Sequence, residues 1–187
     1  MTQVYCDIVM GAPRTDYTLF KNETSCYVNY NSLSEDLPPG VALRPYQDDH
    51  LDLVSAYDYN LMGYDRRHLL ELSSREENSQ TFVALNGREC VGFGSVKLSC
   101  MGAARIGPLY ADDATIAEAL LKNLLKSFPR GRGIMMVTLS NNSKANNLMT
   151  KLSVPTTQEL VQVFSERILE VDTHKVYAHF DVNFCVF

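Results

Sequence analysis

The sequence predicts a single α/β (α+β) domain in which about four helices flank a central sheet. Three observations support this fold class. Helix-like and strand-like hydrophobic spacings alternate along the chain. Asn86-Gly87 joins two strand-like runs and is a strong hairpin signal. An amphipathic segment over 114–128 precedes a continuous apolar run over 134–139, a pattern typical of a helix beside a strand buried on both faces.

The composition is that of a globular domain and narrows the classes of partner. The length of 187 residues fits one domain. Hydrophobic residues make up 45 % of the chain and charged residues 21 %, which is an ordinary balance for a globular protein. The net charge of −5 gives no basic footprint, so we expect no nucleic-acid partner. No window approaches the ~18 apolar residues of a membrane helix, and the N-terminus lacks signal-peptide features. We therefore expect no membrane partner and a cytoplasmic location.

The cysteines suggest neither a disulfide framework nor a metal site. Their number is odd and their spacings match no zinc pattern, so we expect reduced thiols and no metal. The five are Cys6, Cys26, Cys90, Cys100 and Cys185.

The first forty residues differ from the rest. They contain two short β-like runs, Val4–Met10 and Cys26–Tyr30, separated by polar and turn residues. The two prolines in Leu37-Pro38-Pro39-Gly40 indicate a boundary, since proline continues neither a helix nor a central strand. We predict that residues 1–40 are an N-terminal extension packed on a domain spanning 41–187.

Caps and hydrophobic spacing set the elements of the first half of that domain. Asp48 or Asp49 can cap a helix that Gly63 ends, and Asp65 can cap the next helix. The elements predicted here are a strand over 41–46, helices over 50–62 and 66–77, and strands over 79–85, 91–100 and 104–110.

The second half follows the same logic. Asp112 or Asp113 can cap the amphipathic helix over 114–128, and a turn rich in glycine and arginine ends it. Asn142 or Ser143 can cap the last helix. The elements predicted here are a strand over 134–139, a helix over 143–152, and terminal strands over 160–168 and 176–187.

This order of elements resembles the GNAT (N-acetyltransferase) superfamily. The run Arg105-Ile-Gly-Pro-Leu-Tyr-Ala-Asp-Asp113, followed by Ile116-Ala-Glu-Ala-Leu-Leu121, resembles the C-terminal module of a bacterial and nematode GNAT subfamily that often carries tandem domains. Tyr57-Asp58 and Gly63-Tyr-Asp-Arg66 resemble the first helices of that module. The resemblance spans residues 41–187. It implies a mixed, mostly antiparallel sheet splayed between its fourth and fifth strands, and it suggests that residues 1–40 are the remnant of a preceding domain.

The resemblance also implies acetyl-CoA, or another acyl-CoA, as co-substrate. The edge of the fourth strand would pair with the pantetheine arm, although Pro108 offers no donor there. The next helix N-terminus would bind the pyrophosphate. The family has a glycine-rich, basic turn at this point, whereas Asp112 and Asp113 would either repel phosphate or turn away as caps. The implied cofactor residues are Ile106, Gly107, Leu109, Asp113, Ala114, Thr115, Ile116 and Ala117.

The catalytic residues depart from the family pattern. The last helix matches Asn-x-x-Ala-x-x-Leu-Tyr at its first three fixed positions, but Met149 replaces the tyrosine acid. Tyr110 and Asp112 are the nearest remaining candidates, and Tyr110 could instead be an amphipathic residue at the end of the sheet. The resemblance adds three asparagines as cofactor contacts, with helix capping as their alternative role: Asn141, Asn142 and Asn146.

The acceptor side of a GNAT fold lies around the first helix–helix turn. The implied substrate-binding residues are Tyr57, Asp58, Tyr64 and Asp65. Their carboxylates would favour a cationic amine, and the alternative is a helix cap with an Asp–Arg pair. We therefore expect direct transfer of an acetyl group to a primary amine of a small molecule or peptide. The alternative is a degenerate module that binds a ligand or forms a homodimer through the aromatic-rich strand 176–187.

Overall fold

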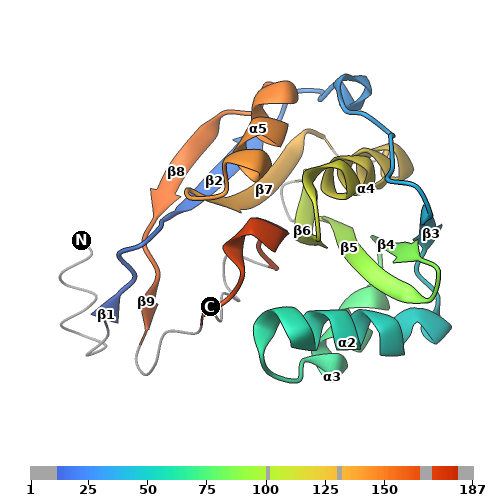
Figure 1. Cartoon of the computed structure of the whole chain (residues 1–187). Coiled ribbons are helices and arrows are strands. Elements are labelled where there is room, and N and C mark those ends of the chain that lie inside the picture. The colour runs from blue at the N-terminus through green and yellow to red at the C-terminus, as the bar shows by residue number, and fades with distance from the viewer. Residues whose placement is uncertain (1–11, 100–101, 130–131, 165–169, 181–187) are drawn as a thin grey trace.

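An eight-stranded sheet organises the chain, with helices against both faces (Figure 1). The structure, a computed structural model, describes residues 12–99, 102–129, 132–164 and 170–180. The strands of the main sheet are β2 (Leu19–Thr24), β3 (Val41–Pro45), β4 (Ser79–Asn86), β5 (Glu89–Leu98), β6 (Ala104–Ala111), β7 (Ile134–Leu139), β8 (Thr156–Leu160) and β10 (Val176–Ala178). A separate antiparallel pair joins β1 (Ala12–Pro13) to β9 (Val163–Phe164).

The helices fall close to the predicted segments. They are α2 (Leu51–Met62), α3 (Arg67–Ser74), α4 (Ala114–Ser127) and α5 (Ser143–Lys151), with short 3-10 turns η1 (Tyr30–Ser32), η2 (Asp48–His50) and η3 (Thr173–Lys175). Gly63 ends α2 in the left-handed region, at φ 76°. Gly87, at φ 62°, completes the predicted hairpin between β4 and β5.

The strand order confirms the predicted fold class. The order is β3-β4-β5-β6-β7-β2-β8, and β10 pairs with β6 outside this path. Neighbours are antiparallel except β6 and β7, which are parallel. The sheet is therefore mixed and mostly antiparallel, as the resemblance implied.

Two apolar clusters hold the helices to the sheet. α4 packs on β4, β5 and β6, while α2 and α3 pack on the opposite face of the same strands (Figure 1). Leu120, Leu121 and Leu124 of α4 are fully buried, and each contributes about 1.5–3 kcal/mol to stability through burial. The buried aromatic rings on the α2 side include those of Phe93 and Tyr110.

The N-terminal segment enters the sheet itself, which corrects the prediction for its strands. Cys26–Tyr30 is not a strand; instead Leu19–Thr24 forms β2 between β7 and β8. The polar residue Asn22 in the middle of β2 interrupts the hydrophobic pattern by which strands are predicted. It is tolerated there because it is buried and donates to the Met136 carbonyl and the Thr138 hydroxyl. Val4–Met10 lies outside the described residues.

The predicted terminal strands also need correction. A strand over 160–168 was expected, but β8 ends at Leu160 and β9 covers Val163–Phe164, while 165–169 lies outside the description. Of the strand expected over 176–187, the described part is β10, which pairs with β6 inside the molecule. Residues 181–187 lie outside the described part.

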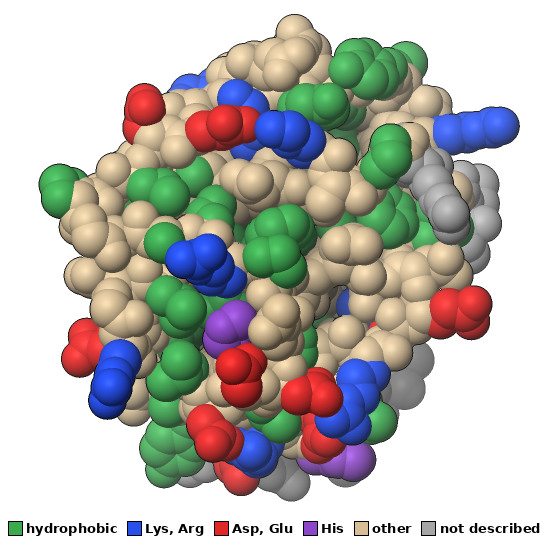
Figure 2. Space-filling view, turned by 90° about the vertical axis from the view of Figure 1, so that its right-hand side faces the viewer, with side chains coloured by type: hydrophobic (Ala, Val, Ile, Leu, Met, Phe, Trp, Pro, Cys, Tyr) green, Lys and Arg blue, Asp and Glu red, His purple; other side chains and the backbone are tan. Residues whose placement is uncertain are grey.

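Charges of both signs share the surface of the molecule (Figure 2). Figure 2 shows a face on which acidic and basic side chains mix with hydrophobic ones. Among the described residues there is no group of three or more His, Cys, Asp or Glu side chains that could hold a metal ion. Within the same residues, every helix is too short or too polar to cross a bilayer.

We expect a chain starting at Val41 to lose at least about 3 kcal/mol of unfolding free energy, because it lacks β2 and the burial of Leu19. Urea denaturation followed by circular dichroism measures this loss. A chain starting at Ala12 is the matched control, since it keeps every described strand. Equal midpoints for all three chains would instead support 41–187 as a domain that folds without the extension.

Candidate functional site

β6 and β7 begin side by side and then diverge. Three registered pairs join them, from Ala104 opposite Ile134 to Ile106 opposite Met136. Beyond these pairs, from Gly107 onward, β6 and β7 no longer pair with each other. There β6 pairs with β10, and the Val137 carbonyl of β7 accepts from the His179 amide. The splay expected between the fourth and fifth strands of the domain is therefore present, and we call it the β6–β7 fork.

Residues 172–180, here called the arm, lie inside the fork. On the β6 side, β10 runs antiparallel with Val176 opposite Tyr110 and Ala178 opposite Leu109. In Figure 1 the arm is the red segment between the two halves of the sheet. An extended segment of the same chain thus adds a strand to the edge that was predicted to bind the cofactor.

The arm also reaches the β7 side. The His179 amide donates to the Val137 carbonyl at 2.9 Å. A Cβ placed on Gly107 would lie 2.3 Å from the His179 carbonyl oxygen, so glycine is required at this close approach. The arm therefore fills the fork from one strand to the other.

Two of the three asparagines predicted to contact the cofactor hold the arm instead. The Asn142 amide donates to the carbonyls of Thr173 and Val176, each at 2.9 Å, and its oxygen caps α5 by accepting from the Ala145 amide. Asn141 donates to the Thr173 hydroxyl at 3.2 Å.

Asn146 acts locally. Its oxygen accepts from the Thr138 hydroxyl at 2.6 Å, and its amide donates to the Leu139 carbonyl at 3.0 Å. It joins α5 to β7, and its side chain is satisfied by the protein.

The N-terminus of α4 is capped by the chain as well. Asp113 accepts from the amides of Thr115 and Ile116 at 2.8 and 2.9 Å, and its carbonyl accepts from the Ala117 amide. Asp113 is thus a cap, the alternative that the sequence left open. Ala114, the first residue of α4, and Ala117 bring no side-chain donor to this turn.

In this conformation the fork does not accommodate acyl-CoA. Pantetheine would need the β6 edge that β10 occupies, and the pyrophosphate would need amides that Asp113 already binds. Ile106 and Leu109 are buried under these contacts. The protein's own residues thus occupy the strand edge and the helix amides that the resemblance assigns to acyl-CoA.

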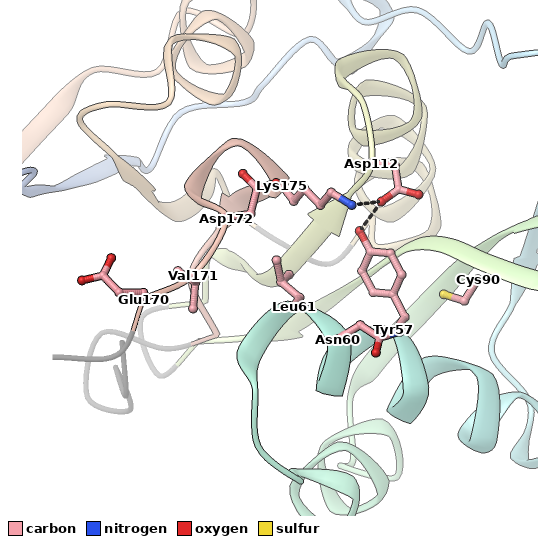
Figure 3. A pocket seen from close by; sticks show the side chains of 9 residues that line it. All are labelled: Tyr57, Asn60, Leu61, Cys90, Asp112, Glu170, Val171, Asp172 and Lys175. Atoms are coloured by element: carbon pink, nitrogen blue, oxygen red, sulfur yellow. Dashed lines mark hydrogen bonds and ion pairs between the residues drawn. The ribbon is translucent and has the colours of Figure 1, made fainter. Parts of the chain in front are cut away.

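An open pocket of about 490 Å³ lies beside the arm (Figure 3). At its wall, the Tyr57 hydroxyl donates to Asp112 Oδ1 at 3.3 Å, and Lys175 Nζ donates to the same oxygen at 2.8 Å. We call it the acidic pocket, and it is lined by Tyr57, Asn60, Leu61, Cys90, Asp112, Glu170, Val171, Asp172 and Lys175.

The electrostatics of the pocket favour a cation. Among the described residues that line it, the carboxylates are those of Asp112, Glu170 and Asp172, against one ammonium, that of Lys175. Burial, together with the nearby Asp112 carboxylate, raises the pKa of Tyr57, so its hydroxyl stays protonated and can donate.

Cys90 is a thiol rather than a nucleophile. Burial raises its pKa to about 12, although a hydrogen bond with the Gly92 backbone opposes the shift. A thiol of this pKa is almost entirely protonated near neutral pH. Cys100 lies outside the described residues.

Of the four residues predicted for the acceptor side, only Tyr57 lines the pocket. Asp58 is fully buried, and Arg66 binds it in two-point fashion, Nε to Oδ2 at 2.9 Å and Nη2 to Oδ1 at 2.5 Å. The structural alternative, an Asp–Arg pair, therefore describes Asp58. Asp65 is exposed and accepts from the Arg67 amide at 2.8 Å, which makes a local turn just before the Arg66 cap of α3.

Tyr110 and Tyr64 pack around Arg66. Tyr110 is fully buried against Phe93, edge to face with ring centroids 5.4 Å apart, and burial raises its pKa. The Arg66 guanidinium lies 5.9 Å from the Tyr110 ring centroid and 5.7 Å from that of Tyr64. Tyr110 thus belongs to the core and not to the pocket, so Asp112 alone of the two catalytic candidates faces the cavity.

The sequence missed the pocket residues that come from the arm. Lys175 and Asp172 lie more than fifty positions beyond Asp112 in the chain, and no motif connects them. Only the insertion of β10 beside β6 brings them to the pocket.

Comparisons with known proteins agree with this fold. A family model described as "Acetyltransferase (GNAT) domain" matches residues 54–178. The chain is 30 % identical over 109 residues to the holothin acyltransferase of Pseudoalteromonas sp. (strain SANK 73390). That alignment covers 58 % of this chain and 36 % of the relative, so the chain spans about a third of the length of the curated relative.

Solved structures show the same fold at low identity. A proposed acetyltransferase from Pyrococcus horikoshii superposes with a TM-score of 0.68 at 20 % identity, over 97 % of this chain and 56 % of that one. A tandem GNAT protein from the clavulanic acid biosynthesis pathway gives 0.55 at 12 % identity, over 86 % and 56 %. The chain thus spans about half the length of each of these proteins.

Replacing Asp58 with Ala is expected to lower the unfolding free energy by about 3–5 kcal/mol, because it leaves the buried Arg66 charge uncompensated. Asp52→Ala is the matched control. Asp52 pairs with Arg67 on the surface, and losing such a pair costs under about 1 kcal/mol. Guanidinium denaturation gives both values; similar costs would contradict a structural role for the buried pair.

His179 makes the arm sensitive to acid. Burial and then the nearby Arg66 and Arg14 lower its pKa to about 3. Between this value and the unfolded value near 6.5 the unfolded chain binds one more proton, so this group lowers stability by up to about 1.4 kcal/mol per pH unit as the pH falls. His179→Gln should flatten this part of the pH dependence of urea midpoints. Identical slopes in the two proteins would rule out His179 as the source.

Proposed function

The chain belongs to the acetyltransferase (GNAT) domain family, and we propose that it transfers an acyl group from acetyl-CoA, or another acyl-CoA, directly to a primary amine of a small molecule or peptide. The observation that carries this proposal is the acidic pocket at the end of β6, where Tyr57 and Asp112 meet. The family match and the relative named as an acyltransferase support the same reaction class.

The residues of the pocket suit a cationic acceptor. Asp112 Oδ1 already binds one primary ammonium, that of Lys175. An amine substrate of the same charge would find an acceptor oxygen there, with Glu170, which precedes the arm, adding negative potential. Tyr57, held protonated, would orient Asp112 by donating to the same oxygen.

The chain also fits one half of a tandem arrangement. Its relatives are about two to three times longer than the matched segments. We propose that residues 41–187 correspond to the C-terminal module of such a protein and that residues 1–40 derive from the end of a preceding domain. A cytoplasmic location is part of the same proposal.

A second candidate function is a GNAT module that binds or scaffolds without catalysis. The filled fork favours it, because β10 occupies the strand edge that acyl-CoA would use. Met149 favours it too, since this residue stands where the family carries a tyrosine acid and is buried in the core.

Acetyl-CoA titration by calorimetry, followed by thiol release with a panel of primary amines, separates the two candidates. We expect Asp112→Asn to raise KM for the amine about tenfold, the weight of about one charge-assisted hydrogen bond. Asp49→Asn, an exposed carboxylate outside the pocket, is the control. No binding at millimolar acetyl-CoA and no thiol release would favour the non-catalytic module.

A further inference from the structure

We propose that the arm is a built-in competitor of acyl-CoA: it occupies the β6–β7 fork in the resting protein, and acyl-CoA binds only after the arm has left. This inference rests on the proposed acyl-transfer function and concerns the regulation of the same site.

The arm takes the hydrogen-bonding positions that an added strand would take in the fork. β10 pairs with β6 at Leu109 and Tyr110, and the His179 amide binds the β7 carbonyl of Val137. Two extended segments cannot use one strand edge at once. Occupation by the arm and occupation by pantetheine therefore exclude each other.

The arm also takes the place proposed for the acceptor. Lys175 presents a primary ammonium to Asp112 Oδ1 at 2.8 Å, which is the contact proposed for the substrate amine. A single segment thus engages both halves of the site, its backbone in the fork and its ammonium in the acidic pocket (Figure 3).

Several features mark the arm as a seated ligand rather than a regular sheet strand. β10 has three residues, and its register with β6 is irregular between Val176 and Ala178. The Asn142 side chain donates to the carbonyls of Thr173 and Val176. These bonds to the arm come from a side chain and not from a second neighbouring strand.

Competition makes the measured affinity for acyl-CoA depend on the fraction of molecules in which the arm has left the fork. The apparent dissociation constant rises in inverse proportion to the open fraction. Any change that weakens the seat of the arm, and leaves the fork intact, should therefore tighten acyl-CoA binding.

The first test weakens the arm by removing two buried methyl groups. Val176→Ala should tighten acetyl-CoA binding about tenfold in calorimetry, by raising the open fraction. Val83→Ala is the matched control, because Val83 is equally buried in the same apolar cluster but lies on β4, away from the fork. Equal affinities for the two variants would overturn the proposal.

The second test follows the arm directly. The chain contains no tryptophan, so Phe180→Trp places a single emission reporter on the arm. Saturating acetyl-CoA should shift its emission to the red as the arm leaves. Adenosine 3′,5′-bisphosphate, which lacks the pantetheine, should leave the emission unchanged. Acetyl-CoA binding without a shift would overturn the proposal.

Hydrogen exchange keeps this inference separate from the proposed function. In the protein without ligand, the arm amides, including that of His179, should exchange at least about 100-fold faster than the amides of β4 and β5, through local opening. Exchange at the same slow rate would make β10 a permanent strand and overturn the inference. If the arm opens but neither valine variant binds acetyl-CoA, the acyl-transfer function fails while the opening of the arm stands.

Discussion

The structure depends on how the backbone is satisfied where β6 and β7 part. Two diverging parallel strands expose amide and carbonyl groups, and buried groups of this kind must be hydrogen-bonded. Here the arm meets that need, through β10 on one strand and His179 on the other. Tyr177 lies in one apolar cluster and Phe180 in the other. This follows from the insertion, because a strand in the sheet points its side chains alternately to the two faces.

The same insertion determines the character of the functional site. It brings Lys175 to Asp112 and completes the acidic pocket against α2. It also gives the asparagines before α5 a partner within the chain. Membership in an acetyltransferase family and a fork filled by the protein's own backbone are compatible if the arm is one of two occupants of the site. The buried Asp58–Arg66 pair lies behind this arrangement, with Arg66 5.6 Å from the Phe180 ring centroid.

Local signals predicted most elements correctly. The Asn86-Gly87 turn, the cap at Asp113 and the amphipathic spacing of α4 each act over a few residues, so the sequence alone reveals them. β2 escaped prediction because its central residue, Asn22, is polar and is satisfied by partners on the neighbouring strands β7 and β8. Asp58 was placed on the acceptor side because a carboxylate in sequence looks the same whether it faces a ligand or a buried arginine.

The sequence by itself determined the fold class, the order of helices and strands from Val41 to Lys151, the family resemblance, and two residues of the pocket, Tyr57 and Asp112. These follow from short-range periodicity, capping and motif spacing. Only the tertiary structure decided what fills the fork and which distant residues meet there. Pairing between segments some seventy positions apart depends on competition among all available strand edges, and no local pattern in the chain records which edge each segment takes.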